Sequence, residues 1–223
     1  MPRVVVVIPA LNEEQSLPLV LRDLPPVDAV IVVDNGSTDA TARRAEQGGA
    51  RVISEPRRGY GTACQAGIRA AEALHPDVLV ILDADWSDHP EELPLLTGPV
   101  LRDEADLVMG DRTVLAAKDA LLPHQRFGNR LATAAMSWVA GHRYRDMGPF
   151  RAIRWSALQR LHMSDPTYGW NVEMQLKALR QGLRVLEVPV HYRPRVGQSK
   201  ISGTVKGSVQ AGVKILSAVR RYA

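Results

Sequence analysis

Short apolar runs alternate with segments of helical periodicity along the first half of the chain. Runs rich in β-branched residues are typical of strands, and they occur at residues 4–8, 29–33, 51–54, 78–82 and 106–109. Between them, apolar residues recur every three or four positions, which predicts helices over residues 15–24, 40–47, 62–74 and 91–102. Strands and helices that alternate in this way indicate an α/β fold with a parallel, doubly wound sheet.

The second half continues with a less regular pattern. The same criteria predict helices over residues 126–140 and 170–181, and strands over residues 150–154 and 184–188. Residues 192–199 contain Pro194 and Gly197, so we expect a loop there. No repeat, low-complexity stretch or linker divides the chain, and its 223 residues fit one large domain.

The C-terminal segment differs from the rest in charge. The chain has 28 Lys and Arg and 24 Asp and Glu, but after Glu187 seven basic residues follow and no acidic one. Between residues 203 and 222, valine and leucine recur at helical spacing, and Lys206, Lys214 and Arg221 fall on another face. We expect one domain over residues 1–201 and a basic amphipathic helix over 202–223, which is part of that domain or associated with a surface. Such a tail is typical of contact with the phosphates of a nucleotide, a lipid surface or a nucleic acid.

Composition and run lengths exclude several classes of protein. Hydrophobic residues make up 45% of the chain and charged residues 23%, as in folded proteins rather than disordered ones. The single cysteine, Cys64, cannot form an internal disulfide, which excludes a disulfide-stapled secreted scaffold. No apolar run approaches the roughly 18 residues of a membrane span, and the opening run is too short for a signal peptide. We therefore expect a cytoplasmic protein, peripheral at the inner membrane face if its acceptor is a lipid.

Acidic residues and an arginine follow the predicted strands, at the sheet edge where α/β proteins bind their ligands. Asp34 follows the second strand, Asp83 and Asp85 follow the fourth, and Arg112 follows the fifth. The Asp-x-Asp spacing puts two carboxylates on one side of an extended turn, which suits a hard divalent cation that also binds phosphate oxygens. Aspartates at strand ends also form turns and helix caps, so this motif alone leaves both interpretations open.

Eight segments occur in the order found in family 2 glycosyltransferases, and they cover nearly the whole chain. They are PALNEE, VVDNGSTDAT, RGYGTACQAG, LDADWSDHPEE, GDR, DMGPFRAIR, GWNVEMQ and GQSKISG. The chain most resembles the branch of dolichyl-phosphate mannose synthase. This resemblance implies the GT-A fold, a single domain with a Rossmann-like, mostly parallel sheet flanked by helices. It also implies an inverting enzyme that takes a sugar from a UDP- or GDP-linked donor and uses Mg²⁺ or Mn²⁺.

The resemblance also assigns roles to individual residues. Asp83 and Asp85 are expected to hold the metal, and Asp85 is also expected to be catalytic. The residues expected to bind the nucleotide-sugar are Pro9, Leu11, Glu13, Asp34, Arg112, Arg126, Arg195 and Lys200. Arg112 is expected to act in catalysis as well, because arginines and a divalent cation stabilise the charge of a departing diphosphate.

The acceptor decides whether the reaction needs a base. A polyprenyl phosphate is already a nucleophile near neutral pH, whereas a soluble hydroxyl acceptor needs a carboxylate to take its proton. Glu173 and Asp146 are the candidates for that carboxylate. Glu173 is equally interpreted as a partner of Arg151 or as a solvated acid on a helix.

Two segments depart from the pattern of this branch. Trp86-Ser87 stands where Leu-Gln or Leu-Ser usually follows Asp-x-Asp, which leaves a third metal ligand unassigned. Gly148-Pro-Phe-Arg151 stands in place of Ser-Gly-Phe-Arg, which leaves the acceptor unassigned.

Two other classes of protein fit the sequence less well. A sugar-phosphate nucleotidyltransferase needs a glycine-rich, basic loop after the first strand, where this chain has PALNEE. A non-enzymatic nucleotide or nucleic-acid binding protein would account for the basic tail. It would not account for the acidic strand ends, which repel a phosphate backbone, so we expect no nucleic-acid partner. Gly59 and Gly61 would either cradle a phosphate or allow a loop with positive φ.

Overall fold

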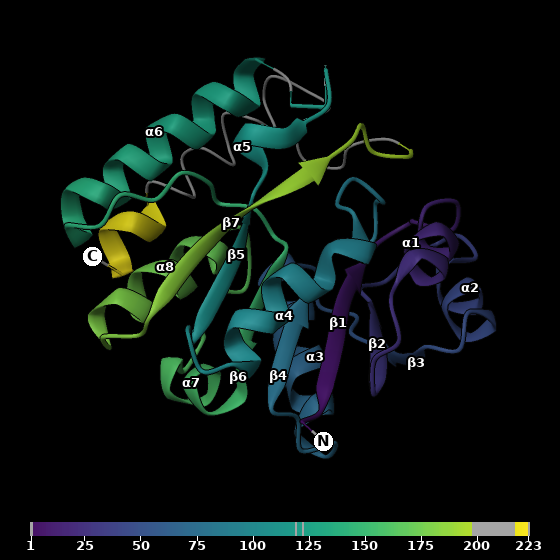
Figure 1. Cartoon of the computed structure of the whole chain (residues 1–223). Coiled ribbons are helices and arrows are strands. Elements are labelled where there is room, and N and C mark those ends of the chain that lie inside the picture. The colour runs from purple at the N-terminus through teal and green to yellow at the C-terminus, as the bar shows by residue number, and fades with distance from the viewer. Residues whose placement is uncertain (1, 119, 122, 198–216, 223) are drawn as a thin grey trace.

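A computed structural model describes residues 2–118, 120–121, 123–197 and 217–222, which are built around one seven-stranded sheet (Figure 1). The strands are β1 Val4–Ala10, β2 Ala29–Asp34, β3 Arg51–Ser54, β4 Val78–Ile81, β5 Leu107–Asp111, β6 Arg151–Arg154 and β7 Val185–Tyr192. Their order across the sheet is β3-β2-β1-β4-β6-β5-β7. Neighbouring strands are parallel except at β6, which runs antiparallel to both β4 and β5. The sheet is therefore mostly parallel, as the resemblance implies, and β6 is its antiparallel strand.

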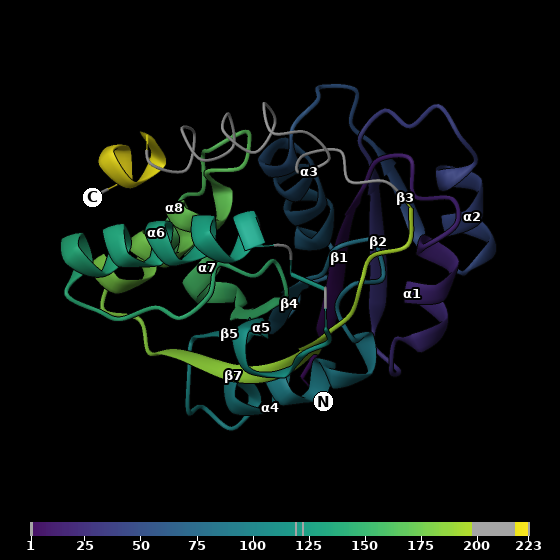
Figure 2. The same ribbon diagram turned by 90° about the horizontal axis from the view of Figure 1, so that it is seen from above.

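Helices cover both faces of this sheet. One face packs against α3 Tyr60–Glu72, α7 Trp155–Leu161 and α8 Trp170–Arg180. The other packs against α1 Leu17–Asp23, α2 Thr41–Gln47 and α4 Leu93–Leu101, which follows the 3-10 turn η1 Pro90–Glu92. Seen from above, α3 and α4 lie on opposite sides of the sheet (Figure 2). After β5 come the short helix α5 Arg112–Leu115 and the longer helix α6 Pro123–Ala140.

Alternate side chains of β1 enter two separate hydrophobic cores. Val5 and Val7 pack on the side of α3 and α8, whereas Val6 and Ile8 pack on the side of α1 and α4. All four are buried. Because both faces of the sheet are covered, β1 has an uninterrupted apolar sequence instead of an alternating one.

Several predicted boundaries are wrong. Helix α3 begins at Tyr60 rather than at Thr62, whose amide nitrogen and hydroxyl donate to the carbonyl oxygen of Pro166 at 3.1 and 3.2 Å. Strand β7 continues past Val188 through Pro189, because β7 is an edge strand and proline's missing N–H removes no essential ladder bond there. Helix α7, which follows β6 directly, was not predicted.

The end of the basic tail packs on the body of the protein. Ala218, Val219 and Tyr222 are buried in the same core as α3 and α8. The ring of Tyr222 lies 5.4 Å from the Nζ of Lys177. The helix predicted from residue 203 lies outside the described residues up to residue 216. In the described part of the chain, no helix has the length and apolar character to cross a membrane.

Candidate active site

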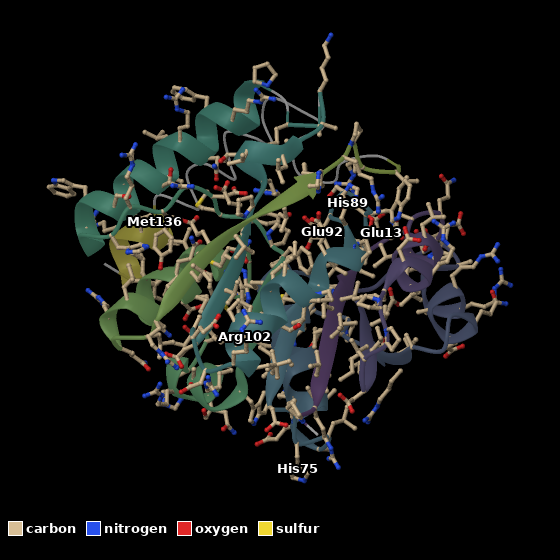
Figure 3. All side chains as sticks on the ribbon, in the orientation of Figure 1. Glu13, His75, His89, Glu92, Arg102 and Met136 are labelled. Carbon is tan, nitrogen blue, oxygen red and sulfur yellow. The ribbon has the colours of Figure 1, made fainter. Side chains whose placement is uncertain are left out.

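A cavity of about 330 Å³ opens at the carboxyl ends of β1, β2 and β4, where α/β sheets bind their ligands. Figure 3 shows Glu13 at this end of the sheet, after β1. Its walls come from the segments that follow these three strands, the start of α3, the turn before α8 and the loop after β7. The polar or aromatic residues among its lining are Glu13, Asn35, Arg58, Tyr60, Asp83, Asp85, Thr167, Tyr168 and Arg195. The cavity is therefore bounded by both acidic and basic groups.

Asp83 and Asp85 line this cavity from the turn after β4. The amide nitrogen and hydroxyl of Ser87 donate to Asp85 Oδ1 at 3.0 and 2.5 Å. The Oδ1 of Asp83 is buried and accepts no hydrogen bond from the residues that the structure describes. Burial, and then the neighbouring charge of Asp85, raise the pKa of Asp83 to about 7. A buried carboxylate oxygen without a donor, beside a second carboxylate, fits a hard divalent cation.

Two carboxylates alone do not complete a cation site. Among residues 2–118, 120–121, 123–197 and 217–222, no three His, Cys, Asp or Glu side chains are arranged to hold a metal ion. Mg²⁺ commonly binds through one or two carboxylates together with substrate phosphates and water. Asp83 and Asp85 therefore suit a cation that arrives with a diphosphate better than a permanently bound one.

Arg195 connects the acidic groups of the cavity. Its Nη2 donates to Glu13 Oε1 at 2.8 Å, and its Nη1 lies 3.4 Å from Asp85 Oδ2. The loop that carries it is fixed to the Asp-x-Asp turn by two backbone hydrogen bonds. Arg193 N donates to the carbonyl oxygen of Ser87 at 2.9 Å, and Val196 N donates to that of Asp85 at 3.0 Å. This guanidinium is thus held beside the carboxylates, where a diphosphate would form charge-assisted hydrogen bonds with it.

Trp86 joins the same two segments from the other side. The guanidinium of Arg193 lies 3.5 Å from the centroid of the Trp86 ring, and its Nε donates to the Trp86 carbonyl oxygen at 2.7 Å. The indole Nε1 in turn donates to Asp23 Oδ2 at 2.7 Å. Trp86 has a φ of 60°, a left-handed conformation that a bulky residue rarely adopts. The residue that departs from the family pattern therefore braces the turn that carries Asp83 and Asp85.

Arg112 and Asp146 form a buried ion pair. The backbone nitrogen and Nε of Arg112 donate to Asp146 Oδ2 at 3.0 and 2.7 Å, and Nη2 donates to Oδ1 at 2.8 Å. Burial favours a protonated Asp146, but Arg112 outweighs it and lowers the pKa of this carboxyl. Gly148 lies so close that a Cβ there would be 3.0 Å from the Nε of Arg112. Asp146 therefore positions Arg112, and neither residue is among those that line the cavity.

Glu173 is an internal residue, which corrects the interpretation of it as a solvated helix acid. Its carboxylate accepts hydrogen bonds from the backbone nitrogens of Ser164 and Asp165 at 2.9 and 2.7 Å. Lys177 Nζ donates to the same carboxylate at 2.6 Å. Glu173 is not among the residues that line the cavity. It instead fixes the segment that leads to Thr167 and Tyr168, which do line it.

The other expected site residues are divided between the cavity and its surroundings. Pro9 and Leu11 line it together with Glu13. Asp34 ends β2 and accepts a hydrogen bond from Ser37 N at 3.0 Å, next to the cavity residue Asn35. Arg126 is exposed on α6 and donates from Nε to the carbonyl oxygen of Leu121 at 3.1 Å, away from the cavity lining. Lys200 lies outside the described residues.

Arg58 also lines the cavity, although it was not among the residues expected there. The signal lay in the two glycines that follow it. A Cβ on Gly59 would overlap the carbonyl oxygen of Pro166, and one on Gly61 would overlap that of Asp165. Because neither glycine has a side chain, residues 165–166 can pack against the start of α3. Arg58, which directly precedes Gly59, lines the cavity at this point. The close approach accounts for both glycines without a bound phosphate.

Comparison with known proteins identifies the kind of protein that has this arrangement. The model of the family described as "Glycosyl transferase family 2" matches residues 5–161. An uncharacterized glycosyltransferase of Mycobacterium tuberculosis is 41% identical over 213 residues, which cover 93% of this chain and 94% of that protein. The undecaprenyl-phosphate mannosyltransferase of Micrococcus luteus is 36% identical over 231 residues, which cover 95% of this chain and 92% of that protein.

A solved structure has the same fold. It is glucosyl-3-phosphoglycerate synthase from Mycobacterium tuberculosis in complex with Mn²⁺, UDP-glucose and phosphoglyceric acid. It superposes with a TM-score of 0.80 at 25% identity, covering 99% of this chain and 79% of that one. The expected GT-A fold is thereby confirmed.

Proposed function

The chain belongs to glycosyl transferase family 2, and from this premise we propose that it transfers a hexose from a nucleoside diphosphate-sugar to a polyprenyl phosphate. The observation that carries this proposal is the pair of carboxylates, Asp83 and Asp85, beside the guanidinium of Arg195 at one cavity. Such a set binds a metal-diphosphate: the carboxylates take the cation and the arginine takes phosphate oxygens. The Mn²⁺ and UDP-glucose in the related synthase support this type of donor.

The reaction follows from the chemistry of such a donor. An oxygen of the acceptor phosphate attacks the anomeric carbon and forms the new C–O bond. The bond between that carbon and the diphosphate breaks on the opposite side, and the nucleoside diphosphate leaves with the electron pair, so the configuration inverts. A divalent cation bound by Asp83 and Asp85 would neutralise charge on the leaving diphosphate.

The protein's own residues prepare this displacement. Arg195 would exchange its contacts with Glu13 and Asp85 for the phosphate oxygens of the donor, because a bidentate arginine–phosphate pair is stronger than two partly solvated ion pairs. Asp34, beside the cavity residue Asn35, is assigned to the nucleoside. Arg112, held by Asp146, adds a positive charge near Asp83, whose pKa it lowers against the larger effects of burial and Asp85.

A phosphate acceptor is favoured by the placement of the two candidate bases. Asp146 is engaged by Arg112, and Glu173 is engaged by backbone nitrogens and Lys177. Neither is among the described residues of the cavity lining, so neither is in place to take a proton from a hydroxyl acceptor. A phosphate acceptor needs no such base. The undecaprenyl-phosphate mannosyltransferase among the relatives supports the same choice.

The proposal is tested by supplying each component separately. Purified protein would be incubated with GDP-mannose or UDP-glucose, a short-chain polyprenyl phosphate and Mg²⁺ or Mn²⁺, and the glycolipid would be measured by mass spectrometry. We expect transfer with one donor, loss of transfer in EDTA, and its recovery when the metal is restored. Transfer to phosphoglycerate or to a free sugar, with none to polyprenyl phosphate, would overturn the acceptor. Undiminished transfer in EDTA would overturn the proposed dependence on a divalent metal.

A further inference from the structure

The outer side of α6 carries large apolar side chains that face solvent. Phe127 is 70% exposed, Leu131 is 49% exposed and Trp138 is 89% exposed. They are separated by four and seven residues, so all three project from the same side of the helix. Isolated exposed apolar residues are common on proteins, but a stripe that ends in an almost fully exposed tryptophan is not.

The packing of α6 on the body of the protein fixes the orientation of this stripe. The opposite side of α6 is buried through Ala132 and Met136, and Figure 3 shows Met136 on the side of the body. Asn129 fixes the rotation of the helix, because its Oδ1 accepts a hydrogen bond from Met147 N at 3.1 Å and its Nδ2 donates to the carbonyl oxygen of Arg145 at 3.1 Å. The packing therefore turns Phe127, Leu131 and Trp138 outward.

Helix α6 and the segment that follows it carry charge of one sign. Residues 120–145 contain four arginines and no acidic residue. Arg126, Arg130, Arg143 and Arg145 are all exposed. One of them, Arg145, makes a long ion pair with Asp111, at 3.8 Å. An exposed apolar stripe with exposed arginines on the same helix and in the segment after it is complementary to anionic headgroups above an acyl layer.

We propose that this face of α6 docks on the surface of a membrane that contains anionic lipids. Trp138 and Phe127 insert at the level of the headgroups, where aromatic side chains are favoured, and the arginines contact lipid phosphates. Asn129 links the docked helix to residues 145–147, and Asp146 within this segment holds Arg112. The inference deepens the proposed function, because a polyprenyl phosphate acceptor is delivered from such a surface, but vesicle binding itself requires no acceptor.

Co-sedimentation with vesicles tests this surface. Vesicles of phosphatidylglycerol and phosphatidylcholine would be compared with vesicles of phosphatidylcholine alone, at low and high salt, using the wild type and two double variants. Phe127→Ser/Trp138→Ser removes the apolar contact, and Arg130→Gln/Arg143→Gln removes two charges. Leu95→Ser, an equally exposed leucine to Leu131 but on α4, is the matched control.

We expect the wild type and the Leu95 control to sediment with the anionic vesicles at low salt. Arg130→Gln/Arg143→Gln is expected to bind roughly tenfold or more weakly, since each basic residue contributes about fivefold at an anionic surface. Phe127→Ser/Trp138→Ser is also expected to bind more weakly, because it removes both inserted aromatic side chains. Thermal midpoints should be unchanged, because the altered side chains are exposed. A wild type that stays in the supernatant at low salt overturns the proposal, as does equal binding by Phe127→Ser/Trp138→Ser. A wild-type dimer that this variant converts to a monomer would assign the face to a second copy instead. Vesicle binding without any transferase activity would leave this inference standing and overturn the proposed function.

Discussion

Replacing Asp146 by asparagine is expected to destabilise the whole fold, although the change in volume is negligible. The carboxylate accepts three hydrogen bonds from Arg112 and one from Met147 N at 2.7 Å. Asparagine offers one acceptor oxygen and turns an NH₂ group toward the guanidinium. Removing one partner of a buried ion pair costs about 3–5 kcal/mol, because the other charge stays buried without compensation.

The loss converts to a measurable change in melting temperature. In a chain of this size, each kcal/mol shifts the midpoint by roughly 2–4 °C, so Asp146→Asn should melt about 6–20 °C below the wild type. Calorimetry or circular dichroism at pH 7 would measure the shift. Asp103→Asn is the matched control, because Asp103 also contacts two arginines, Arg154 and Arg184, but is exposed to solvent. The control should melt close to the wild type.

The pH dependence provides a second check on the same pair. Arg112 lowers the pKa of Asp146 in the folded state, despite the opposing effect of burial. A carboxyl with a lowered pKa contributes stability above its unfolded pKa of roughly 4, and that contribution is lost as the pH falls through the folded value. The difference in melting midpoint between wild type and Asp146→Asn should therefore be largest at neutral pH and become smaller only in acid. A midpoint for Asp146→Asn that equals the control at pH 7, or a gap that grows in acid, would refute this account of the pair.

Three further substitutions test the site. Asp85→Asn should reduce metal-dependent transfer about 100-fold or more with little change in the melting midpoint, since its side chain bonds to Ser87 in the same turn and its contact with Arg195 is a long ion pair at 3.4 Å; a wild-type rate would contradict its role. Asp34→Asn should weaken binding of free nucleotide and of nucleotide-sugar by the same factor in calorimetric titrations. If only the affinity for nucleotide-sugar fell, Asp34 would contact the sugar and not the nucleoside. Gly61→Ala should cost about 1–3 kcal/mol of stability because its Cβ overlaps the carbonyl oxygen of Asp165, whereas Gly128→Ala, where no atom lies within 4 Å, should cost nothing. Equal melting of the two alanine variants would show that the close approach is not needed.

The sequence was most informative where a single strand and the residues after it determine the outcome. The apolar runs of β1, β2 and β4 predicted both the strands and the edge at which Asp83 and Asp85 meet Glu13. The resemblance supplied Arg195, which no local pattern would have brought across the chain to these carboxylates. Long-range pairings of this kind depend on the path of β7 and its loop.

Other features were beyond prediction because they depend on tertiary contacts. A four-residue strand such as β6 has the same sequence appearance whether it pairs in parallel or antiparallel fashion, so its reversal was not visible. The sequence around Glu173 is typical of an exposed acidic residue on a helix. Only the tertiary contact with Ser164 and Asp165 makes it a buried acceptor of hydrogen bonds. Gly61 has an ordinary helical backbone, and the reason for a glycine there lies about a hundred residues further along, at the carbonyl oxygen of Asp165.

The reversed strand also imposes an order on assembly during synthesis. Strand β5 has no neighbour among the strands made before it, because β6 separates it from β4. As the chain emerges from the ribosome, β1 to β4 pair with one another, while β5 and the open edge of β4 wait for Arg151–Arg154 to be made. Until then an unpaired edge of Val78–Ile81 is available to other chains. A nascent chain stalled before β6 would therefore have a four-stranded sheet with the edge of β4 unpaired. At this stage of synthesis the chain would depend most on a chaperone.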